Sequence, residues 1–170
     1  NNATLTSAQF ASLGMSQIDS AVELSLMNRV LDTATTSQVD TGAELQALGD
    51  TVAGIFVTAA GGTASPAVTA AGLTAIGLTG VTSSNLAVIL AAIAATSDDG
   101  TGVDTIAELQ SVANAAIAAQ GAMQALSGYT GANGQTAPTT ANFATAGITG
   151  VTSANLSMVN AYLASLPAGA

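Results

Sequence analysis

The stretch that decides the fold reads Gly77-Leu-Thr-Gly-Val-Thr-Ser-Ser-Asn-Leu86, and the chain repeats it. A close copy is Gly147-Ile-Thr-Gly-Val-Thr-Ser-Ala-Asn-Leu156, and a diverged copy is Gly14-Met-Ser-Gln-Ile-Asp19. The first glycines of the three copies are 63 and then 70 residues apart. Recurrence at such a spacing is typical of tandem arrays, in which one small unit is repeated and each copy contacts its neighbours.

A short pattern, segment A, leads into each copy: Thr, three residues, a large apolar residue, three residues and Gly. Thr is a favourable N-cap, and Gly directly after a helix tolerates the positive φ of the C′ position. Segment A is therefore predicted to be a helix of about two turns. The copies are Thr6–Gly14, Thr69–Gly77 and Thr139–Gly147, and their apolar anchors are Phe10, Leu73 and Phe143.

Segment B follows each copy and carries apolar residues at a spacing of three and then four, which indicates one face of a helix. Thr82 and Thr152 stand where N-caps belong, and Asp19 takes that place in the first copy. The repeated stretch is thus predicted to be a corner between two helices. The copies are Glu23–Leu31, Asn85–Ile93 and Asn155–Leu163, and Val81 with Leu86 and Val151 with Leu156 would form hydrophobic staples.

Segment C begins with a capping box, in which Thr and Glu three residues apart bind each other's free backbone N–H groups. Thr41 with Glu44 and Thr105 with Glu108 fit this pattern. Helices are predicted from about residue 42 to 58 and from about 106 to 127. Gly49 and Gly54 are expected to weaken the first of them, because Gly has a low helix propensity.

The expected fold is all-α, with tandem three-helix repeat units of a short A helix and longer B and C helices. The predicted units are residues 1–62, residues 63–134 and a partial third unit, residues 135–170. The third unit lacks its C helix within the sequence. Either the array is cut there or another chain completes the open end.

Charge is scarce and one-sided: 6% of residues are charged, Arg29 is the only base, and the formal net charge is −9. Nucleic acids and anionic membrane surfaces are poor partners for such a chain, because they need Lys and Arg. No apolar run is long enough to span a bilayer, so no membrane insertion is expected. The chain is not expected to be an enzyme, because it lacks His and Cys and its helix caps account for Glu44 and Glu108.

One loop, Asp98-Asp-Gly-Thr-Gly-Val-Asp104, has the character of a metal site. Asp98, Asp99 and Asp104 supply carboxylates beside flexible glycines, and oxygen ligands of this kind suit Ca²⁺. The distal bidentate Glu of an EF-type loop is missing, since that position is Leu109. A plain solvated turn is the alternative to a calcium site, and no other cofactor is expected.

Two stretches, Ile148-Thr-Gly-Val-Thr-Ser-Ala-Asn-Leu-Ser-Met-Val-Asn160 and Val103-Asp-Thr-Ile-Ala-Glu-Leu-Gln110, resemble Ala/Thr-rich helical tandem repeats of large bacterial surface and adhesin-type exoproteins. The resemblance covers most of the chain and implies an extracellular, secreted location and a structural or adhesive role. It carries no catalytic residues over. The chain departs from the pattern at Gln17, where the other copies have Gly, and at Leu90, where the third copy has Asn.

The function expected from these observations is that of a non-enzymatic structural or adhesive protein of the cell surface. It would be a module of a long surface protein or the subunit of an extracellular filament or layer. Its partners would be neighbouring repeats or copies of itself, in a homo-oligomer or polymer. The alternative is a binding module for glycans or ice, which low charge and abundant Thr and Ala would suit. A carboxylate hydrolase would need two acids facing one cleft.

Overall fold

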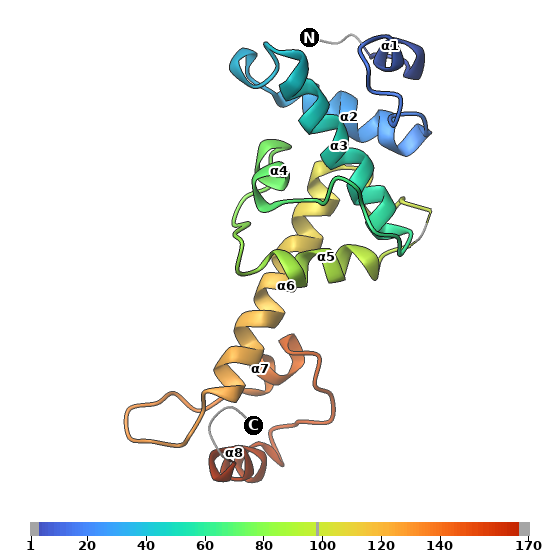
Figure 1. Cartoon of the computed structure of the whole chain (residues 1–170). Coiled ribbons are helices and arrows are strands. Elements are labelled where there is room, and N and C mark those ends of the chain that lie inside the picture. Colours follow the sequence, from blue (N-terminus) through green and yellow to red (C-terminus); the bar gives the residue numbers. More distant parts are fainter. Residues whose placement is uncertain (1–3, 98, 167–170) are drawn as a thin grey trace. The chain divides into compact units, whose positions relative to one another are not determined.

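All regular elements in the described part of the chain, residues 4–97 and 99–166 of a computed structural model, are helices (Figure 1). This confirms the all-α class. The chain divides into two compact units, residues 1–114 and residues 115–170, and the boundary falls inside helix α6. The repeat limits predicted from the sequence, at 62/63 and 134/135, stay predictions.

The first unit contains five α-helices, a 3-10 helix and the beginning of α6. The second contains the rest of α6 and two further helices. In chain order they are α1 (Ser7–Ser12), α2 (Ala21–Thr33), η1 (Thr36–Gln38), α3 (Gly42–Ala59), α4 (Ala70–Ala75), α5 (Leu86–Ala94), α6 (Ile106–Ser127), α7 (Thr140–Thr145) and α8 (Leu156–Ser165).

The three short helices α1, α4 and α7 match the predicted A segments. Each begins after a Thr whose hydroxyl accepts a hydrogen bond from the N3 backbone N–H. A Gly with positive φ stands two residues after the end of each helix. The N–H of the residue after this Gly donates a hydrogen bond to the carbonyl of the apolar anchor. This is the Schellman arrangement, which satisfies carbonyls at the helix end. The anchors Phe10, Leu73 and Phe143 are buried, as predicted.

The start of the B helices differs from the prediction. Helices α5 and α8 begin at Leu86 and Leu156, four residues after the expected caps Thr82 and Thr152. Residues 83–85 and 153–155 form a turn, so that Asn85 and Asn155 precede the helices. The Thr82 hydroxyl pairs with that of Ser84, whereas the Thr82 N–H binds Asn85 Oδ1 at 2.8 Å. The cap of α2 is also corrected, from Asp19 to Ser20, which forms a capping box with Glu23.

Helices α3 and α6 agree with the predicted C segments. The Thr41–Glu44 box is formed at the start of α3, and Thr105 and Glu108 form the same bonds before α6. The residues of 54–58, β-prone by composition, are helical as expected. Helix α3 lies at the centre of the first unit, where it packs against α2, α4 and α5 (Figure 1).

Gly49 and Gly54 of α3 also serve packing, a role that their low helix propensity does not indicate. A Cβ added at Gly54 would lie 2.7 Å from a methyl carbon of Val68, and one at Gly49 would lie 3.1 Å from Met15 Sδ. Neighbouring segments therefore approach the α3 backbone closely. In a core with few aromatic residues, such close approach maintains packing density.

Candidate functional site

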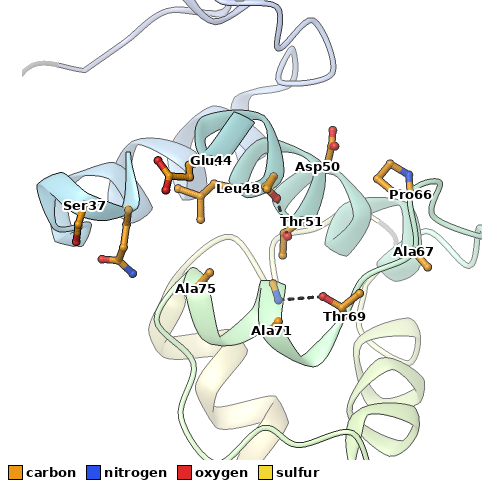
Figure 2. Close-up of a pocket in the computed structure, with 13 residues that line it drawn as sticks. Ser37, Glu44, Leu48, Asp50, Thr51, Pro66, Ala67, Thr69, Ala71 and Ala75 are labelled. Atoms are coloured by element: carbon orange, nitrogen blue, oxygen red, sulfur yellow. Dashed lines mark hydrogen bonds between the residues drawn. The ribbon is translucent and has the colours of Figure 1, made fainter. Parts of the chain in front are cut away.

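A groove of about 490 Å³ lies between α3 and α4 (Figure 2). Small and apolar residues line part of it, including Ala47, Leu48, Ala71 and Ala75. The polar residues that line it include Ser37, Gln38, Glu44, Asp50 and Thr69. A concave apolar floor with a few polar groups is the usual form of a small-molecule site.

The shape of the groove depends on the contact between Gly72 and Thr51, which both line it. A Cβ at Gly72 would lie 2.5 Å from Thr51 Oγ1, so only Gly lets α4 approach α3 this closely. Thr51 is buried, and its hydroxyl donates to the Ala47 carbonyl at 2.8 Å. The Thr69 hydroxyl accepts from the Gly72 N–H, as Figure 2 shows. The hydroxyls of Thr51 and Thr69 are therefore both engaged in hydrogen bonds within the chain.

Both carboxylates that line the groove, those of Glu44 and Asp50, accept hydrogen bonds from the chain itself. Glu44 Oε2 accepts from the hydroxyl and the N–H of Thr41, and the hydroxyl in particular holds the pKa of Glu44 below its ordinary value. The hydrogen bond with Glu44 raises the pKa of Asp40. Asp50 Oδ1 accepts from the side-chain amides of Gln17 and Gln46. These bonds serve helix starts and packing, which accords with the structural roles expected for the acids.

The acidic loop expected to bind Ca²⁺ is described only in part, because Asp98 lies outside the described residues. Asp99 accepts from the N–H and hydroxyl of Thr101, and the N–H in particular lowers the pKa of Asp99. Asp104 faces Glu108, and a hydrogen bond between them raises the pKa of Asp104. Within the described residues, no three acids lie close enough to hold a metal ion. The calcium site stays a prediction.

The only basic residue is Arg29, and its nearest acids in the sequence are Asp32 and Glu23. In the structure its charge opposes the rise in the pKa of Asp104 that the hydrogen bond with Glu108 causes. It also adds to the lowering of the pKa of Glu108, of which the hydrogen bond with the Thr105 side chain is the main cause. These acids lie about 75 residues away in sequence, so local spacing carried no signal for them. The groove was missed for the same reason, since its walls come from residues 37 to 75 and depend on the packing of α4 on α3.

In residues 4–97 and 99–166, no helix is both long and apolar enough to cross a membrane. Comparison of the chain with family models, with curated proteins and with solved structures gave no match.

Proposed function

We propose that the chain is a tandem array of three-helix units, with the limits 1–62, 63–134 and 135–170. Three local observations support this reading. The Schellman ends at Gly14, Gly77 and Gly147 use the same two backbone bonds. Asn85 and Asn155 bind the same two backbone groups of their corners. Gln46 with Asp50 in α3, and Gln110 with Asn114 in α6, form the same hydrogen-bonded pair one turn apart.

The function that this architecture supports best is that of a non-enzymatic extracellular protein with a structural or adhesive role. It is a module of a bacterial surface protein or the subunit of an extracellular filament or layer. One observation carries the proposal. The polar side chains at the corners and at the starts of the long helices form hydrogen bonds with the backbone of the chain itself. Such residues build a scaffold and leave little for chemistry. The resemblance to adhesin-type repeats supports the same role.

Immunogold electron microscopy tests the location and the form together. Antibodies raised against the purified chain are applied to intact and to permeabilised cells of the source organism. The proposal predicts gold on intact cells, either over the cell surface or along extracellular filaments. Labelling that requires permeabilisation contradicts it. A control antibody against a cytoplasmic protein shows that the intact cells are sealed.

The groove between α3 and α4 supports a second candidate function, the binding of a small uncharged ligand such as a glycan. Its volume of about 490 Å³ lies in the range of small-molecule sites, and the polar side chains of Ser37 and Gln38 line it. Ala71→Trp would fill the groove from α4. If glycan-array binding by the native chain is lost in this variant and kept in Ala161→Trp, which changes an exposed position of α8, the groove is the ligand site. Absence of binding by the native chain removes this candidate.

A further inference from the structure

The second unit exposes three large apolar side chains on its corner and on α8. Ile148 is 41% exposed, Met158 71% and Tyr162 68%. Met158 and Tyr162 are four residues apart, so they share one face of the helix. We call these three residues the open face. None of the residues of α8 is buried.

The corresponding positions are covered in the first unit. Met15 and Leu78, which correspond to Ile148, are each 1% exposed. Leu26 and Val30 of α2, which correspond to Met158 and Tyr162, are at most 1% exposed. In α5 the same two positions, Val88 and Ala92, are half-buried. The open face therefore consists of positions that are buried in the first copy and buried or half-buried in the second.

The cover is a helix in both cases. At the first corner α3 packs on α2, and the side chain of Met15 lies against Gly49. At the second corner the start of α6 lies beside the corner, with Ile106 3.8 Å from the position of a Cβ on Gly77, and α5 packs against α3. The side-chain amide of Gln110 binds both backbone groups of Thr79. Its Oε1 accepts from the Thr79 N–H at 2.8 Å, and its Nε2 donates to the Thr79 carbonyl at 3.2 Å.

The third corner has the same groups without a cover. Thr149, which corresponds to Thr79, is exposed, and among the described residues nothing binds its backbone N–H. A Cβ added at Gly147 would meet no atom within 4 Å. Residues 115–170 contain no charged side chain, so recognition here must rest on apolar contact and neutral hydrogen bonds.

We propose that the open face binds an amphipathic α-helix of the kind of α3 and α6. This inference rests on the repeat architecture proposed above and names the partner of its last unit. The helix begins with Thr-x-x-Glu and carries a Gln two residues after the Glu, as Gln46 and Gln110 stand in α3 and α6. That Gln binds the backbone of Thr149, and an apolar stripe with small residues covers Ile148, Met158 and Tyr162. Binding is nearly independent of salt, because one partner surface is uncharged.

The test is a methyl-NMR titration of the full chain with a synthetic peptide of residues 103–127, which contains α6 and its capping box. The chain carries ¹³C-methyl methionine, and the peptide is unlabelled. The Met158 signal is expected to shift until saturation, while Met15 and Met27, both buried, stay in place. Met123, which is exposed on α6, is the control for unspecific apolar contact.

Variants locate the site. Tyr162→Gln is expected to lower the affinity of the chain for the peptide at least about tenfold. Leu13→Gln changes another exposed apolar residue and is expected to leave this affinity unchanged. A peptide with Gln110→Ala is expected to bind about two- to tenfold more weakly, because one set of hydrogen bonds is lost.

Three results would overturn the proposal. The first is no Met158 shift at a peptide concentration of about 1 mM, the weak end of specific binding. The second is a shift that follows the concentration of the chain and not that of the peptide, since the occupant is then a second copy. The third is an equal shift of Met123. If the peptide does not bind but gold labels intact cells, only this inference is refuted. If the peptide binds but labelling requires permeabilisation, only the cell-surface role is refuted.

Discussion

The buried side chain of Asn85 stabilises the second corner, residues 77–86, through hydrogen bonds with its backbone. Its side chain is 8% exposed, its Oδ1 accepts from the Thr82 N–H, and its Nδ2 donates to the Gly80 carbonyl at 2.9 Å. The sequence pattern predicts Asn85 as the first residue of a B helix. It lies buried directly before that helix, because a side-chain amide can replace both missing backbone partners of the turn.

Removing this amide should destabilise the first unit. Asn85→Ala is expected to lower the free energy of unfolding by about 1–2 kcal/mol, because two hydrogen bonds are lost at a buried position. The measurement is a urea unfolding curve followed by circular dichroism. Asn155→Ala removes the same two bonds at a half-buried position, so its expected loss is smaller. Equal curves for Asn85→Ala and the native chain would contradict this role.

The acid pair at the start of α6 gives a second prediction at this scale. A hydrogen bond with Glu108 raises the pKa of Asp104, and Arg29 opposes the rise. Glu108→Gln is therefore expected to lower the pKa of Asp104, and Arg29→Gln to raise it. An NMR titration of the Asp104 side-chain carboxyl signal measures both shifts. Shifts of the same sign in the two variants would show that the charges act through another group.

The caps of α3 and α6 also set a pH dependence. The pKa values of Glu44 and Glu108 are lowered by the hydroxyls of Thr41 and Thr105. Their contribution to stability is therefore complete above the ordinary Glu pKa of about 4.3, and it is lost as the pH falls through the lower pKa of the folded state. Glu44→Gln keeps the capping box, since Gln can replace Glu there. We expect this variant to flatten the fall of the melting temperature between about pH 5 and pH 2. If the melting temperature of Glu44→Gln falls with pH as steeply as that of the native chain, the proposed contribution of Glu44 is contradicted.

At the scale of the element, the glycines of the long helices have opposite roles. Gly54 faces Val68 so closely that a Cβ would overlap it, whereas Gly121 in α6 has no atom within 4 Å of a Cβ. Gly54→Ala is expected to destabilise the chain by about 1–3 kcal/mol through overpacking. Gly121→Ala is expected to stabilise it by up to about 1 kcal/mol, because Ala has the better helix propensity. Thermal unfolding of the two variants should therefore shift in opposite directions. Stabilisation by both would refute the packing role of Gly54.

The elements themselves could be predicted because their signals are local. Thr and Glu three residues apart determine where α3 and α6 begin, and Gly after an apolar anchor determines where α1, α4 and α7 end. The contacts of Gly54, the burial of Asn85 and the groove depend on which surfaces meet. Sequence spacing within one element does not contain that information. The 3-10 helix η1 was missed, since three residues of Ser, Thr and Gln carry no periodic pattern.

At the scale of the molecule, the repeated corners define the points at which one unit could be removed in register. A tandem array tolerates the loss of a whole unit, because each unit contacts only its neighbours. From Gly77 to Gly147 one period is 70 residues, so deleting Ala70–Thr139 joins Thr69 to Thr140 in register. In the shortened chain α7 and α8 would take the places of α4 and α5 against α3. Phe143 would then fill the position of Leu73.

This deletion tests the repeat architecture most directly, with helix content and cooperative melting followed by circular dichroism. Deleting Ala70–Asp104, half a period, is the control, because it removes α4 and α5 from α3 and supplies no replacement. The proposal predicts that the chain lacking one full period stays helical and melts cooperatively, and that the chain lacking half a period does not. Loss of cooperative folding in the in-register deletion, or equal folding of both, would contradict the proposal.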